Sequence, residues 1–240
     1  MDPTMSSALG QTGDISFLFL GRKFVIRLDP KVASPNYYTD LLIENLENLN
    51  LDGRVVLDAG SGTGIISVLA LTVLRAASVW AVDIDPDAVA LTKHNCLSNG
   101  CDPKRIRFIQ ADIRELTPPE TLDVILANPP QIPTPDIASG PCSGGPSGRD
   151  VMEAILRLGS RSLRPGGSLV MTAADFVGEE ELIRFSHSLG MSVRTIATRV
   201  CEPGPYTLSF RPYIERGGYE FGSRNGKLFF TLNLLAFGVS

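Results

Sequence analysis

The sequence predicts an α/β protein built on a doubly wound, Rossmann-like and mostly parallel seven-stranded sheet with an antiparallel edge strand. Two observations carry this prediction. Short aliphatic segments alternate with longer amphipathic ones, which is typical of successive βαβ units. In addition, the glycine-rich turn Gly60-Ser61-Gly62-Thr63-Gly64 separates the buried strand Val55–Leu57 from a helix that begins at Ile65. Glycines at alternate positions let such a turn tighten and let a ligand approach the backbone.

The N-terminal part of the chain, residues 1–50, is expected to form a short extension. Ile15–Leu28 alternates apolar and polar residues around a glycine, as a strand pair or hairpin does. Tyr37–Leu49 carries leucines at helical spacing and predicts a helix. Asp52-Gly53 then marks the turn into the main domain. We expect the hairpin and the helix to cover the ligand site of that domain.

The main domain spans residues 51–240, and its elements follow from periodicity and from start and stop signals. Pro86 opens one helix and Asn99-Gly100 ends it, while Arg164-Pro165-Gly166-Gly167 predicts a turn before a strand. The expected helices are Ile65–Ala77, Pro86–Asn99, Asp150–Leu163 and Glu179–Leu189. The expected strands are Val55–Leu57, Val79–Val82, Ile106–Ile109, Val124–Ala127, Leu169–Thr172, Val193–Val200 and Leu228–Phe237, the last two pairing in antiparallel fashion at one edge.

Composition and charge limit the classes of function. With 240 residues, 43% hydrophobic and 20% charged, the chain suits one well-buried domain and not a disordered protein. The net charge of −4 leaves no broad cationic surface for a phosphate backbone, so we do not expect nucleic acid as a partner. Four cysteines and two histidines without metal-ligand spacing predict no metal site and a cytoplasmic protein. No segment predicts a secretory leader or a membrane span.

Polar side chains end four of the predicted strands: Asp58, Asp83, Asp112 and Asn128. Ligands of open parallel sheets bind at the carboxyl ends of the strands, so we expect these side chains to share one site. Asp83 follows the glycine turn at the distance where a carboxylate accepts the hydroxyls of a ribose. Asp112 could accept a hydrogen bond from an adenine amine, with Ile84 and Ile113 on the two sides of the base.

The run Asn128-Pro129-Pro130 follows a core strand and predicts the catalytic centre. Proline has no backbone N–H, so Pro129 and Pro130 offer carbonyl acceptors only, and Asn128 is held extended. The Asn128 side-chain oxygen and a neighbouring carbonyl can then accept both hydrogens of an NH₂ group. These bonds would aim the nitrogen lone pair at an electrophilic carbon, and alignment of this kind can supply roughly 7–11 kcal/mol of a barrier.

The ordered motifs resemble those of class I S-adenosylmethionine-dependent methyltransferases, and more narrowly the branch that methylates glutamine in translation release factors. The matching segments are Val56–Gly64, Ala81–Asp85, Ala111–Ile113, Asn128–Pro130, the Gly-Gly-x-x-Gly element Gly144–Asp150, and Ser34–Asp40, which is similar to a segment that folds over the cofactor. The resemblance covers residues 15–175. It implies S-adenosyl-L-methionine as cofactor, bound by Thr39, Asp58, Gly60, Gly62, Gly64, Asp83, Ile84, Asp112, Ile113 and Asn128.

The chain departs from that branch in two ways that bear on the acceptor. Gln131 stands where relatives carry an aromatic residue that stacks on a planar group, and no helical docking domain is visible in residues 1–50. We therefore expect N-methylation of a small or amino-acid-like molecule bound by Gln131, Tyr37 and Tyr38. Tyr206 and the stretch Glu202–Lys227 are expected to complete that pocket.

Three alternatives remain open at this point. The first is glutamine N5-methylation on a release factor or similar protein, with or without a helper subunit. The second is an NAD(P)-binding oxidoreductase, which would leave Asp112 and the Asn-Pro-Pro run without a role. The third is a non-catalytic cofactor-binding protein. A further expectation concerns the Pro- and Gly-rich segment Gln131–Arg149, which is long for a structureless loop and is predicted to be a lid over the acceptor.

Overall fold

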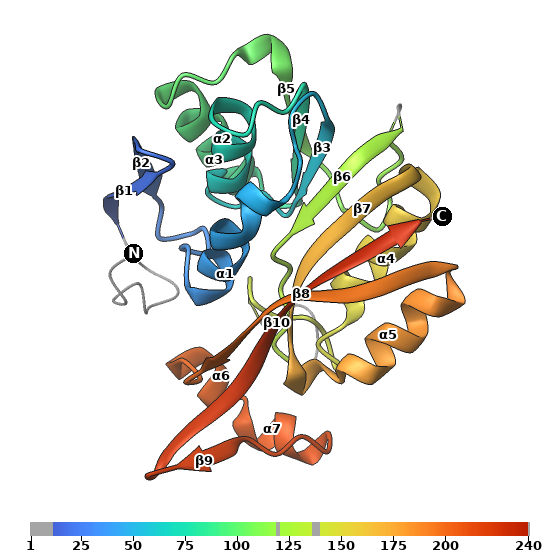
Figure 1. Cartoon of the computed structure of the whole chain (residues 1–240). Helices are drawn as coiled ribbons and strands as arrows, with labels where there is room; N and C mark the ends of the chain where they lie inside the picture. Colours follow the sequence, from blue (N-terminus) through green and yellow to red (C-terminus); the bar gives the residue numbers. More distant parts are fainter. Residues whose placement is uncertain (1–11, 119–120, 136–139, 240) are drawn as a thin grey trace.

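A computed structural model describes residues 12–118, 121–135 and 140–239 of the chain (Figure 1). The strands are β1 (Gly13–Phe19), β2 (Arg22–Leu28), β3 (Val55–Ala59), β4 (Ser78–Asp83), β5 (Ile106–Gln110), β6 (Leu122–Ala127), β7 (Leu163–Ala174), β8 (Met191–Cys201), β9 (Gly222–Arg224) and β10 (Lys227–Val239). The α-helices are α1 (Tyr37–Asn45), α2 (Ile65–Thr72), α3 (Pro86–Ser98), α4 (Asp150–Ser162), α5 (Glu179–Ser188), α6 (Pro205–Ser209) and α7 (Arg211–Arg216).

The central sheet has the strand order β5-β4-β3-β6-β7-β10-β8, and the short strand β9 pairs with β10. The first five strands of this order run parallel, whereas β10 is antiparallel to both β7 and β8. Helices α2 and α3 pack together beside β4, and α4 and α5 pack together beside β7 and β8 (Figure 1). This confirms the mostly parallel α/β sheet with an antiparallel end. The strand order reverses between β3 and β6, which is where a doubly wound sheet binds its ligand.

Burial explains why the central strands read as continuous apolar runs. Every residue of β6 is buried, and β3 is buried except at its first position. Parallel strands are covered by helices on both faces and therefore do not alternate apolar with polar residues. The hairpin β1–β2 does alternate, and it forms a separate sheet. Asn95 of α3 holds this hairpin by accepting from the Arg27 N–H at 2.9 Å and donating to the Arg27 carbonyl at 3.0 Å.

Several predicted boundaries were wrong, each for a local reason. Strand β7 begins at Leu163, so the predicted turn Arg164–Gly167 lies inside it; the pairing of β6 with β7 shifts register there, and these four residues form an irregularity. Helix α2 ends at Thr72 because the Val73 and Leu74 N–H groups both donate to the Leu69 carbonyl. Helices α6 and α7 were not predicted, since both are short and each carries a proline in its first turn.

Candidate active site

A cavity of about 1290 Å³ opens at the carboxyl ends of the central strands. Its walls come mainly from three parts of the chain: residues 31–40 before and within α1, the ends of β3, β4, β5 and β6 with the loops and helices that follow them, and residues 199–207 from the end of β8 into α6. The segment before α1 and the C-terminal stretch therefore reach the same site as the sequence motifs. Among the described residues, the hairpin β1–β2 does not line the cavity and instead packs on α3.

The glycine turn is fixed by backbone bonds and leaves space above it. The N–H groups of Gly60 and Ser61 both donate to the Val82 carbonyl at 2.9 Å, which ties the turn to β4. Gly60 has φ of +79° and lines the cavity. A Cβ on it would meet no atom within 4 Å, so the side chain of a larger residue would occupy open space next to the turn. A Cβ on Gly64 would lie 2.9 Å from Thr92, because α3 packs closely there. These features suit a ligand that contacts the backbone directly.

Asp83 is held with its carboxylate at the cavity wall. Its Oδ2 accepts from the Gly62 N–H at 2.9 Å, and its Oδ1 accepts from the Asp85 N–H at 3.0 Å. Each oxygen keeps a second lone pair for a ligand hydroxyl. Burial raises the pKa of Asp83. The next residue, Ile84, lines the cavity with 59% of its surface exposed, which offers an apolar face to a flat ring.

Asp58 is more deeply placed than a ligand contact at the cavity mouth would be. It is 3% exposed, and its Oδ2 accepts both the Ser67 N–H at 3.1 Å and the Ser67 hydroxyl at 2.6 Å. Burial raises the pKa of this carboxyl to about 7. The side chain therefore joins the end of β3 to the first turns of α2 while it lines the cavity.

Asp112 and Ile113 also line the cavity, but Asp112 already has a partner within the protein. Both of its oxygens lie 2.9 Å from Arg114 Nε, and Oδ2 lies 2.5 Å from Arg114 Nη2. This guanidinium lowers the pKa of Asp112. Arg114 was missed in the sequence, where it carries no motif. A ring amine bound by Asp112 would share that carboxylate with Arg114.

Asn128 follows β6 and is bonded at both ends of its amide. Its Oδ1 accepts from the Thr172 hydroxyl at 2.9 Å, and its Nδ2 donates to Thr39 Oγ1 at 3.1 Å. Thr39 is placed by the capping box of α1, in which the Asn36 side chain accepts from the Tyr38 N–H and Thr39 Oγ1 accepts from the Asn36 N–H. The structure thus brings Thr39 and Asn128 together. Thr172 was missed because it lies inside an apolar strand without a motif.

The tyrosines expected at the acceptor lie on one side of the cavity. Tyr37 and Tyr38 stack with their ring centroids 4.7 Å apart, and Tyr38 packs on Phe230 of β10 at 6.1 Å. Burial raises the pKa of both hydroxyls. Tyr206 of α6 also lines the cavity, next to Gly140.

Gln131 is bound to β7 by its side chain. Its Oε1 accepts from the Ala174 N–H at 2.7 Å, and its Nε2 lies 3.4 Å from the Pro129 carbonyl and from both oxygens of Thr172. Only 3% of its surface is exposed. These bonds use the amide within the protein, so Gln131 has little free capacity for an acceptor.

The described parts of the segment 131–149 form a bonded structure around Asn-Pro-Pro. The Ile132 N–H donates to the Cys142 carbonyl and the Gly144 N–H to the Ile132 carbonyl, each at 2.9 Å. A Cβ on Gly144 or Gly148 would lie within 3 Å of backbone atoms, including those of Gln131. The glycines of Gly-Gly-x-x-Gly therefore allow close packing against the turn that contains Asn-Pro-Pro and Gln131. Residues 136–139 of the predicted lid lie outside the described residues.

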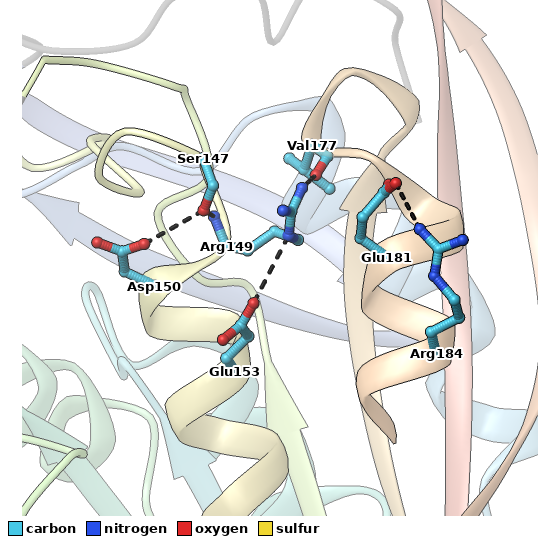
Figure 2. Close-up of polar contacts among 7 residues, drawn as sticks. All are labelled: Ser147, Arg149, Asp150, Glu153, Val177, Glu181 and Arg184. Atoms are coloured by element: carbon cyan, nitrogen blue, oxygen red, sulfur yellow. Dashed lines mark hydrogen bonds and ion pairs between the residues drawn. The ribbon is translucent and has the colours of Figure 1, made fainter. Parts of the chain in front are cut away.

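Arg149 anchors the far end of this segment (Figure 2). From the start of α4 its Nη1 donates to the Val177 carbonyl in the turn before α5, and its Nε lies 3.6 Å from Glu153 Oε1. Ser147 Oγ donates to Asp150 Oδ1 at 3.2 Å in the same turn. These contacts fasten the Gly-Gly-x-x-Gly element to two helices.

Comparison with known proteins identifies the family. The model of the methyltransferase small domain matches residues 34–199. The chain belongs to this family. It is 32% identical over 178 residues to a candidate protein N5-glutamine methyltransferase of Methanocaldococcus jannaschii, covering 72% of this chain and 87% of that protein. It is 29% identical over 188 residues to the release factor glutamine methyltransferase of Geobacter sulfurreducens, covering 74% of this chain and 62% of that protein.

A solved structure of similar fold is the 16S rRNA N2 G1207 methyltransferase of T. thermophilus in complex with AdoMet and guanosine. It aligns with a TM-score of 0.65 at 20% identity, over 95% of this chain and 50% of that one. At this identity the likeness shows the fold alone. Membership of this family confirms the prediction that the chain is an S-adenosylmethionine-dependent methyltransferase. It therefore contradicts the alternative that the chain is an NAD(P)-binding oxidoreductase.

Two negative findings complete the description. Within residues 12–118, 121–135 and 140–239, no cluster of three or more His, Cys, Asp or Glu side chains could hold a metal ion. No helix in the described part of the chain has the length and apolar character needed to cross a membrane.

Proposed function

We propose that this methyltransferase transfers a methyl group to the N5 atom of a glutamine side chain presented by a protein. The observation that carries the proposal is the fixed amide of Asn128 at the cavity, followed by two prolines whose carbonyl oxygens act only as acceptors. A primary amide has two N–H groups to donate. Asn128 Oδ1, which keeps one lone pair beside the Thr172 bond, and a proline carbonyl would accept them.

The chain's residues would act mainly by binding and alignment. When bound, S-adenosylmethionine supplies a methyl carbon activated by a sulfonium. Asp83 suits the ribose of the cofactor, and the open turn at Gly60 leaves space for the part of the cofactor that passes over the backbone. Ile84 and Ile113 suit its adenine ring. Asn128 would orient the amide nitrogen toward the methyl carbon. The new carbon–nitrogen bond would replace the carbon–sulfur bond of the sulfonium, the cofactor would leave as a neutral thioether, and one amide proton would pass to water, which leaves an N-methyl amide. Alignment of two bound reactants can supply roughly 7–11 kcal/mol of the barrier.

The bonded state of Gln131 favours a protein acceptor over a small molecule. The cavity of about 1290 Å³ exceeds the roughly 300–1,000 Å³ of a single small-ligand site, so it has space for an acceptor group beside a nucleoside. The small-molecule hypothesis also relied on a free Gln131, whose amide is bonded to β7. The relatives named as glutamine methyltransferases support the same choice. Such an acceptor in the translation machinery would fit the cytoplasmic location expected from the sequence.

The test is a transfer assay with labelled S-adenosylmethionine. The acceptors are an intact translation release factor, the same protein with its methylatable glutamine changed to glutamate, oligonucleotides and pooled metabolites. We expect label in the unmodified release factor and none in the glutamate variant. Label confined to the metabolite pool would support the small amino-acid-like acceptor instead, and label in the oligonucleotides would contradict both.

A further inference from the structure

A chain of side-chain hydrogen bonds runs from β7 to the catalytic amide. The Ala174 N–H donates to Gln131 Oε1 at 2.7 Å, which leaves the Gln131 Nε2 group on the side of Thr172. Thr172 in turn lies 2.9 Å from Asn128 Oδ1, and Asn128 Nδ2 lies 3.1 Å from Thr39 Oγ1. All members of this chain except Asn128 are buried.

The first bond fixes which end of the Gln131 amide faces Thr172. A backbone N–H can only donate, so Gln131 Oε1 must be the acceptor at Ala174 and Gln131 Nε2 must be the donor at Thr172 Oγ1. The single hydroxyl proton of Thr172 is then available to Asn128 Oδ1. At the other end Asn128 Nδ2 donates to Thr39 Oγ1, so both ends of the Asn128 amide have a partner in the orientation that the structure shows.

We propose that Thr172 and Gln131 are positioning residues that fix the oxygen end of the Asn128 amide toward the acceptor. This inference rests on the proposed function of Asn128. If the amide turned over, its NH₂ group would face the NH₂ group of the acceptor, and donor would meet donor. In this proposal Gln131 acts through Thr172 and does not itself bind the acceptor.

The proposal is tested first without any acceptor. The variant Thr172→Val keeps the side-chain shape and removes the hydroxyl. In the unmodified protein, NMR should show one pair of proton signals for the Asn128 side-chain NH₂ group, with a nuclear Overhauser contact to the Thr39 methyl group. In Thr172→Val that contact should weaken and a second pair of signals should appear. Thr172→Ser should retain the single pair. An unchanged NH₂ signal in Thr172→Val would overturn the proposal.

The second readout is kinetic and uses the acceptor that the unmodified enzyme methylates. Thr172→Val should lower kcat about tenfold or more while the Kd for S-adenosylmethionine stays within about threefold, and Thr172→Ser should restore kcat. Gln131→Met should lower kcat less than Thr172→Val, because the hydroxyl remains. Equal kcat for valine and serine variants would overturn the positioning role.

The control variant is Thr198→Val, which removes a Thr–Asn hydrogen bond of the same kind, from Thr198 Oγ1 to Asn233 Oδ1 at 2.7 Å, outside the cavity. It should leave kcat and the Asn128 signal unchanged. If the unmodified enzyme methylates none of the offered acceptors, the proposed function fails, and the NMR arm still decides whether Thr172 orients Asn128.

Discussion

The side-chain nitrogen of Asn128 donates to Thr39 Oγ1 across 3.1 Å and so joins the start of α1 to the turn after β6. Thr39 belongs to the capping box of α1. The start of one helix therefore helps to hold the Asn128 amide, although 89 residues separate the two in sequence. Residues 31–40 form one wall of the site.

Loss of the Asp83 carboxylate should weaken cofactor binding. A hydrogen bond to a charged group contributes about 1.5–3 kcal/mol, so Asp83→Ala should raise the Kd for S-adenosylmethionine roughly ten- to a hundred-fold in calorimetry. Asp52→Ala is the control, because Asp52 pairs with Arg75 at the surface and neither residue lines the cavity. Equal affinities for the two variants would show that Asp83 does not bind the ribose.

The buried Asp58 should make stability depend on pH. Its pKa is raised from 3.8 to about 7 by burial, so the folded state binds more protons than the unfolded state between these values. Stability should therefore fall as pH rises from about 4 to about 7 and then level off, by on the order of 4 kcal/mol relative to Asp58→Asn. Urea unfolding of both proteins at several pH values measures this difference.

A second variant sharpens the pH experiment. Ser67→Ala removes the hydroxyl that donates to Asp58 Oδ2 and stabilises the carboxylate. The decline in stability should then extend to higher pH than in the unmodified protein. Parallel pH profiles for the unmodified protein and Asp58→Asn would refute the assignment to Asp58.

Close packing of the glycine turn on α3 should be visible in stability. Gly64 and Gly190 have nearly the same φ, +77° and +75°, but a Cβ on Gly64 would lie 2.9 Å from Thr92 and a Cβ on Gly190 would meet nothing within 4 Å. Gly190→Ala should cost about 1 kcal/mol of unfolding free energy from backbone strain alone, and Gly64→Ala clearly more. Similar losses for both variants in urea unfolding would rule out the close contact.

Much of this fold and site could be predicted because the determining signals are local. The sheet followed from periodicity, and the ligand-binding end of the sheet from the residues after β3, β4 and β6. The partners of Gln131 could not be predicted, since they lie on β7 some 43 residues away and depend on the register of two strands. Helices α6 and α7 escaped prediction because they are too short for a periodic pattern.

The central claim is that Asn128 aligns the acceptor and is not needed to bind the cofactor. Its most direct test compares Asn128→Ala with the unmodified enzyme, measuring the Kd for S-adenosylmethionine by calorimetry and methyl transfer in single-turnover experiments, with the surface variant Asn50→Ala as control. We predict a Kd within about fivefold of the unmodified enzyme and a transfer rate lower by roughly a hundredfold or more. Near-normal transfer by Asn128→Ala would contradict the account.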